Sequence, residues 1–164
     1  MSIVRHWQDI KMKLVFESVL IGLIAGILVV AYRVILDLVG EFSEKAYHYM
    51  KFHYWLIPVW FLILIAIALF VKYRTKRVPM MSGSGIPQVE GELLGHIDMS
   101  WWKVLVNKFV SGALMIGAGL SLGREGPSVQ IGALVGKGVS RVFKRVRVEE
   151  KYLISCGAGA GLSG

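Results

Sequence analysis

The chain has 164 residues, of which 55% are hydrophobic and 18% charged, and its net charge is +8. Its mean hydropathy of +0.59 is higher than soluble domains of this size usually reach, which indicates a bilayer as the surrounding solvent. The basic residues gather at the edges of apolar runs, which argues against a nucleic-acid-binding surface, and the single Cys156 excludes a disulfide framework and a cysteine metal site within this chain.

The first two long apolar stretches predict two membrane spans. Residues 14–40 form the first, in which residues 18–32 carry no charge, and residues 55–73 form the second, with aromatic residues at both of its ends. Residues 1–13 alternate apolar and basic side chains at helical spacing. This pattern predicts a short cytoplasmic helix on the membrane surface, with a plain solvated helix as the alternative.

The charges around these spans predict their orientation. The loop at residues 41–54 carries two acids and two lysines, whereas the second span is followed by basic residues and no acid, namely Lys72, Arg74, Lys76 and Arg77. By the positive-inside rule, the N-terminus and residues 72–80 are cytoplasmic. We therefore expect a multi-pass protein of the plasma membrane. His48 and His53 in the outer loop receive no metal-binding role.

After Pro79 the apolar runs become shorter and are interrupted by glycine or proline. We expect a half-helix at residues 84–94, a span at 101–122, a second half-helix at 126–140 and a final helix at 148–164. Broken helices at membrane depth normally line a polar site. Gly157, Gly159, Gly161 and Gly164 predict a small-residue packing face on the final helix.

The first of two polar loops precedes the half-helix at 84–94. Its residues are Gly83, Ser84, Gly85, Ile86 and Pro87. Proline suits the first turn of a helix, and a serine just ahead of it is typical of a helix N-terminus. The flanking glycines let the backbone approach a bound species, while the hydroxyl, the free amides and the helix dipole favour an anion.

The second loop repeats this pattern and adds a carboxylate. Its residues are Gly123, Arg124, Glu125, Gly126 and Pro127. At a positive helix end in a low-dielectric site, an ionised Glu125 can occupy the anion position, and a protonated Glu125 can leave it vacant. The sequence therefore predicts a gate that is operated by a proton.

Two simpler interpretations compete with these loops. Both motifs can be ordinary turns, in which Glu125 caps a helix or pairs with Arg124 at a surface. The glycine-rich runs at 117–119 and 157–161 resemble nucleotide loops, but neither ends in Gly-Lys-Ser/Thr nor lies in a strand–helix–strand context. We therefore expect neither an enzyme nor a bound cofactor.

The two loops together, some 40 residues apart after two spans, resemble the CLC chloride channels and proton-coupled chloride antiporters. The resemblance covers the whole chain, including Gly157 to Leu162. It implies the first part of the CLC inverted-repeat fold, an all-α polytopic membrane protein with broken and re-entrant half-helices. A second, inverted repeat with a further proton-path glutamate and the dimer-forming helices is absent from the 164 residues.

Carried over residue by residue, the resemblance makes Ser84 a hydroxyl ligand of a central anion site. The backbone amides of Arg124 to Gly126 become donors to an outer site, and Glu125 becomes the gating glutamate shared by chloride and proton. The serine of the first motif implies chloride and similar anions rather than fluoride. The resemblance also implies a homodimer for the full-length protein, in a lipid bilayer.

Three functions stay open at this point. The first is proton-coupled chloride antiport, the second is a passive chloride channel of the same architecture, and the third is a non-transporting membrane piece if residues 1–164 are expressed alone. The glutamate that separates the first two would lie outside this chain.

Overall fold

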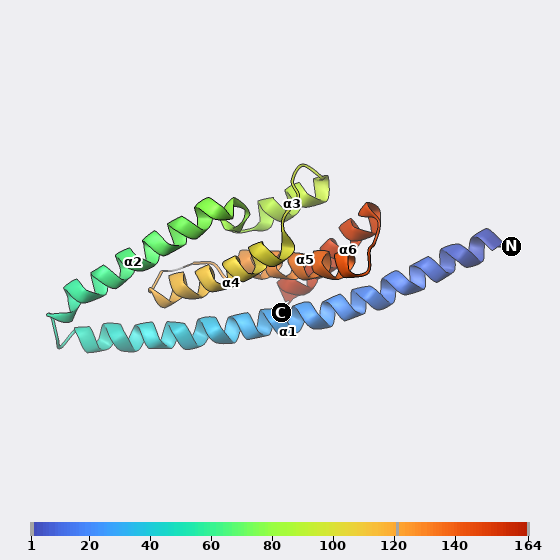
Figure 1. The fold of residues 1–164 in the computed structure, drawn as a ribbon. Coiled ribbons are helices and arrows are strands. Elements are labelled where there is room, and N and C mark those ends of the chain that lie inside the picture. The colour runs from blue at the N-terminus through green and yellow to red at the C-terminus, as the bar shows by residue number, and fades with distance from the viewer. Residues whose placement is uncertain (1, 121, 164) are drawn as a thin grey trace.

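The computed structural model describes the backbone of residues 2–120 and 122–163, and the side chains of this part from Met12 onwards. Every regular element in it is helical. In chain order these are α1 (Ser2–Met50), α2 (Leu56–Arg77), the short 3₁₀ helix η1 (Pro79–Met81), α3 (Ile86–Leu94), α4 (Trp101–Gly117), α5 (Glu125–Val142) and α6 (Arg147–Ser163). The molecule is elongated, with α1 along its whole length and α4, α5 and α6 beside it (Figure 1).

Helix α1 corrects two predicted boundaries. It runs without a break through residue 13, where the surface helix was expected to end, and past residue 40, where the span was expected to end. Its 49 residues correspond to about 73 Å at 1.5 Å per residue, far more than the hydrocarbon thickness. The extension past Gly40 is held by tertiary contacts, because Ser43 Oγ donates to the carbonyl of Gly117 at 2.6 Å and Tyr47 Oη donates to that of Ala118 at 3.1 Å.

One stripe of α1 faces the protein and the rest faces outwards. The buried residues recur every three or four positions: Ile21, Ala25, Val29, Tyr32 and Leu36. They pack against Ile131 and Val135 of α5 and against Leu153 of α6. The opposite face is apolar and exposed, including Val19, Leu23 and Ile27, as expected for a helix that contacts lipid.

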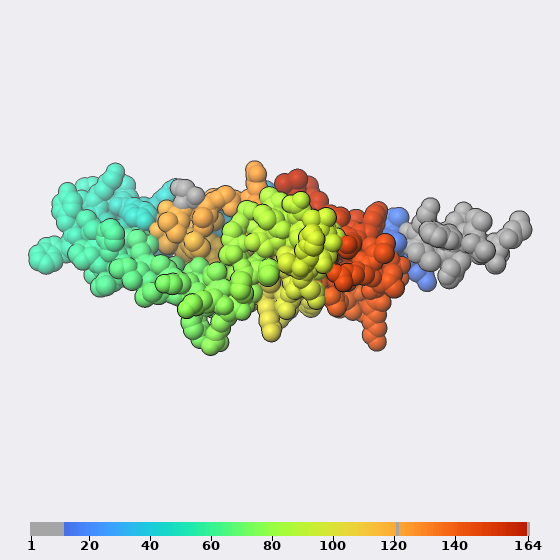
Figure 2. Space-filling model, turned by 90° about the horizontal axis from the view of Figure 1, so that it is seen from above, coloured from blue at the N-terminus to red at the C-terminus, as the bar shows by residue number. Residues whose placement is uncertain are grey.

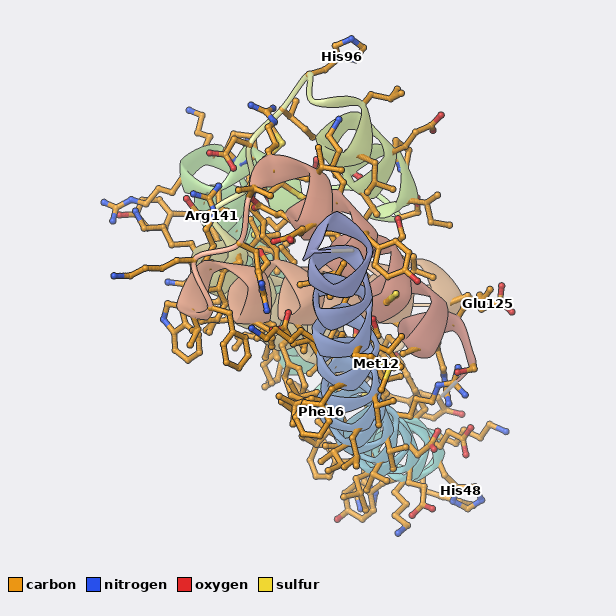
Figure 3. The ribbon with its side chains drawn as sticks, turned by 90° about the vertical axis from the view of Figure 1, so that its right-hand side faces the viewer. Met12, Phe16, His48, His96, Glu125 and Arg141 are labelled. Atoms are coloured by element: carbon orange, nitrogen blue, oxygen red, sulfur yellow. The ribbon has the colours of Figure 1, made fainter. Side chains whose placement is uncertain are left out.

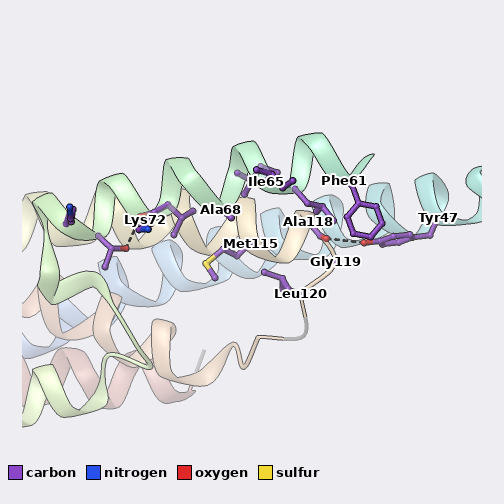
Figure 4. A pocket seen from close by; sticks show the side chains of 14 residues that line it. Tyr47, Phe61, Ile65, Ala68, Lys72, Met115, Ala118, Gly119 and Leu120 are labelled. Carbon is purple, nitrogen blue, oxygen red and sulfur yellow. Dashed lines mark hydrogen bonds between the residues drawn. The ribbon is translucent and has the colours of Figure 1, made fainter. Parts of the chain in front are cut away.

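By length and composition, Met12–Met50 and Leu56–Arg77 are able to cross a membrane. Helix α2 has no buried residue among those described. It lies beside α4 across an apolar groove of about 880 Å³ (Figure 4). Tyr47 closes one end of this groove through its hydrogen bond to Ala118, and Lys72 lies towards the other end.

Helices α5 and α6 touch through their backbones. A Cβ atom placed on Gly132 would lie well under 3.0 Å from the carbonyl of Gly157, and one on Gly136 would meet that of Leu153 just as closely. Gly161 is equally close to Ser128 of α5. The predicted small-residue face is therefore present, although a Cβ on Gly159 would meet nothing within 4 Å. Gly164 lies outside the described residues.

Helix α3 packs on α5 and α6 around a shared core to which α4 also contributes, and its residues lie over the middle of the molecule when viewed from above (Figure 2). This core joins five elements through Met81, Val89, Met99, Val104, Ala133, Leu134 and Ile154.

The later helices differ from their expected bounds by a few residues. Helix α4 ends at Gly117 and not at 122, because Gly119 takes a positive φ of 83°. Helix α5 is longer than the expected 126–140, since it starts at Glu125 and ends at Val142. Helix α3 starts at Ile86 instead of 84, because Gly85 has a left-handed conformation.

Candidate anion site

The two loops meet at the starts of α3 and α5. A Cβ atom on Gly126 would lie 2.5 Å from the carbonyl oxygen of Ser84 and 2.9 Å from its Cβ, so the loops touch where Gly126 has no side chain. A Cβ on Gly85 would collide with the buried Gln130 of α5. Only glycine fits at these two positions, which explains one glycine of each motif.

The first loop turns through two left-handed residues. Gly83 has φ +69° and Gly85 has φ +95°, which side chains rarely adopt. Pro87 lies in the first turn of α3, as its position in the motif predicts. The turn is anchored from behind, because Gln130 Nε2 donates to the carbonyl of Met80 at 2.8 Å and Gln88 Nε2 donates to that of Ser82 at 3.0 Å.

The second loop leads into α5 with Arg124 as the residue before the helix and Glu125 in the first turn. The guanidinium of Arg124 forms an ion pair with Asp37 of α1 and not with Glu125. Ser128 Oγ donates to the carbonyl of Arg124 at 2.8 Å. The side chain of Glu125 is exposed and points away from the ribbon (Figure 3), so the carboxylate is accessible to solvent.

The start of α5 supplies free donors. Pro87 and Pro127 have no N–H group, and the amides of Glu125 and Gly126 have no acceptor within the described part of the chain. Each helix start also carries partial positive charge from its dipole, equivalent to about half an elementary charge. Two helix starts that meet in this way attract a small anion.

Both loops line one open cleft of about 890 Å³. Eight of the ten predicted site residues lie on its wall: Gly83, Ser84, Ile86, Gly123, Arg124, Glu125, Gly126 and Pro127. Gly85 is buried under the loop against Gln130, and Pro87 lies on α3 outside the wall. Helices α4 and α2 also line the cleft, through residues such as Lys108 and Thr75.

Lys108 of α4 is a cleft residue to which the sequence analysis gave no role, although it lies within the span expected at 101–122. Its side chain is 5% exposed, and its Nζ donates to the carbonyls of Met81 at 3.0 Å and Gly83 at 2.6 Å. It therefore holds the first loop in place and adds a positive charge beside the cleft. The signal was present in the sequence, because a lysine inside an apolar span is usually functional.

The comparisons with known proteins agree with this geometry. Residues 67–164 match the family model described as voltage gated chloride channel. The chain belongs to this family. The CLC resemblance inferred from the two loops is therefore confirmed, and with it the all-α polytopic membrane fold.

Similar members of the CLC family are exchangers. The H(+)/Cl(-) exchange transporter ClcA of Klebsiella pneumoniae is 36% identical over 151 residues, which cover 90% of this chain and 32% of that protein. ClcA of Vibrio cholerae is 35% identical over 162 residues, with 90% and 32% covered. The chain thus spans about a third of the length of these CLC relatives.

A solved CLC structure superposes on most of the chain. The crystal structure of a slow cyanobacterial Cl-/H+ antiporter matches with a TM-score of 0.79 at 31% identity, and the match covers 92% of this chain and 36% of that one. The helices of this chain are therefore arranged as in the matching part of a structure named as that of a Cl-/H+ antiporter.

Proposed function

We propose that the protein containing this chain exchanges chloride for protons across a membrane, with Glu125 as the gate. The observation that carries the proposal is the placement of Ser84 and Glu125 on one cleft, at the starts of two helices whose loops touch. Proteins similar to this chain in sequence and in fold are named as chloride and proton exchangers.

The proposed chemistry uses the donors at the helix starts. A chloride ion lies near the Ser84 hydroxyl and the free amides of Glu125 and Gly126, with the charge of Lys108 behind the first loop. The ionised Glu125 carboxylate competes for the same donors, because it carries the same charge as chloride. Protonation removes this competition and lets the side chain leave, so that one proton and the anion alternate at one position.

The surrounding assignments belong to the same proposal. We place the protein in the plasma membrane with a cytoplasmic N-terminus, because the last turn of α2 carries Arg74, Lys76 and Arg77 and no acid, and Lys144 and Arg145 follow α5. The functional unit is a homodimer, as the family resemblance implies.

The test is a Glu125→Gln variant of the intact protein in liposomes. Glutamine keeps the size of the side chain but cannot exchange a proton, so chloride should still cross while proton movement driven by a chloride gradient disappears. Glu41→Gln is the matched control, because Glu41 is an exposed acid of α1 outside the cleft. Persistent proton pumping by Glu125→Gln would show that the gate assignment is wrong.

A passive chloride channel is the second candidate. Glu125 is the one carboxylate on the described cleft wall, and an exchanger needs a further group to pass the proton onwards. Reversal potentials measured in a pH gradient separate the two. A channel gives the chloride equilibrium potential regardless of pH, whereas an exchanger gives a value that moves with the proton gradient.

A further inference from the structure

The candidate site depends on how α3 lies relative to α5. The two helices run parallel, since Ser84 meets Gly126 at their starts and Glu92 meets Lys137 towards their ends. Helix α3 has only nine residues, too few to be stable alone in water. Its position, and with it the position of Ser84, is therefore set by contacts with other elements.

At the end away from the site, α3 is held by an ion pair. Nζ of Lys137 lies 2.6 Å from Oε1 of Glu92, and the two side chains are 2% and 8% exposed. Removing one partner of such a buried pair leaves an uncompensated charge in the interior. The pair is thus a strong constraint on where the last turn of α3 can lie.

The same lysine also binds the segment that joins α3 to α4. Lys137 Nζ donates to Asp98, and the second oxygen of Glu92 accepts the backbone N–H of Met99 at 2.6 Å. Arg141, one turn further along α5, lies 3.4 Å from Asp98 and 3.1 Å from Glu150 of α6. Lys137 therefore joins α5 both to Glu92 near the end of α3 and to Asp98 in the segment that leads into α4.

We propose that Lys137, paired with Glu92 and Asp98, is a positioning residue that fixes Ser84 relative to Glu125 and so sets the affinity and selectivity for the anion. The inference rests on the proposed function of the two loops as an anion site. Lys137 does not line the cleft itself. Its effect is transmitted through the nine residues of α3, which behave as a rigid body between Glu92 and the Ser84 loop.

The first experiment measures chloride binding to the intact protein by isothermal titration calorimetry, together with the Cl⁻/Br⁻ preference. Lys137→Gln leaves Glu92 buried and unpaired, so chloride should bind roughly tenfold more weakly and the preference should fall. The double variant Glu92→Gln with Lys137→Gln replaces the ion pair by a neutral hydrogen-bonded pair and should restore most of the affinity.

Arg145→Gln is the matched control. Arg145 pairs with the buried Glu17, with Nε 3.0 Å from Oε2, but this pair joins the segment after α5 to α1 and does not touch α3. The variant should lower the unfolding temperature and leave the chloride dissociation constant within about twofold of wild type. Equal losses of affinity in both variants would reduce the Lys137 pair to a general stabilising contact and overturn the proposal.

A second measurement does not depend on transport or chloride. Cys156, the single cysteine, is first replaced by serine. Spin labels are then attached at two exposed positions, Glu90 on α3 and Val142 at the end of α5, and they report the distance between these helices. Lys137→Gln should broaden the distance distribution. An unchanged distribution would show that Lys137 does not fix the position of α3 relative to α5. A failure of the proposed function would be seen in a different measurement, as proton exchange in liposomes that persists in the Glu125→Gln variant.

Discussion

Gly126→Ala tests the contact between the two loops directly. The added Cβ would lie 2.5 Å from the carbonyl oxygen of Ser84, whereas ordinary van der Waals contact begins at 3.4 Å. The loops must therefore separate by about 0.9 Å at the point where the anion is expected to bind. Overpacking of this kind costs about 1–3 kcal/mol of stability.

The functional loss should exceed the loss of stability. A displacement of about 1 Å in a site with fixed donors can cost as much as a hundredfold, so we expect chloride affinity to fall between roughly tenfold and a hundredfold. Titration calorimetry measures the affinity, and liposome flux measures transport. Coupling to protons should remain, because the Glu125 carboxylate is unchanged.

Gly123→Ala is a control within the same motif. A Cβ on Gly123 would meet nothing within 4 Å, and its φ is not positive. This variant should keep wild-type affinity to within about twofold. The reasoning would be refuted if Gly126→Ala bound chloride as well as wild type, or if Gly123→Ala lost as much.

Two further changes test the surroundings of the site. Lys108→Met removes a buried charge and two hydrogen bonds, one to Gly83 of the first loop and one to Met81 of η1. Chloride flux in liposomes should therefore fall at least about tenfold, whereas Lys103→Met, at an exposed position, should change it little. The hydrogen bond from Lys137 lowers the pKa of Asp98 below its usual value. The stabilising contribution of the ionised Asp98 is therefore present above the usual pKa and is lost as the pH falls through the lowered pKa. The free energy of unfolding, measured from pH 7 to 3, should fall less steeply in Asp98→Asn than in wild type. The difference should be under about 1 kcal/mol because Asp98 is exposed, and an identical slope would contradict this.

The motif loops were the part of the molecule that the sequence predicted best. Glycine and proline restrict the backbone locally, so the turns at Gly83 to Gly85 and the start of α5 follow from residue type alone. The motifs also indicated the family, which the match of residues 67–164 to the family model confirmed.

Helix lengths and long-range pairs were not predictable in the same way. Nothing local ends α1 at residue 40, and its extension depends on Ser43 and Tyr47 meeting the end of α4, some 70 residues later in the chain. Lys137 received no role from the sequence, because its partners Glu92 and Asp98 lie about 40 residues away. Such pairs require the fold before they can be recognised.

The backbone contact between α5 and α6 limits how the candidate gate can move. Gly132, Gly136 and Gly161 leave no side-chain layer between the helices that could deform and absorb a shift. A displacement of the α5 backbone at Glu125 would therefore have to carry α6 with it. We expect opening at this position to occur by rotation about the χ angles of Glu125, on the nanosecond timescale of exposed side chains, while both helices stay in place.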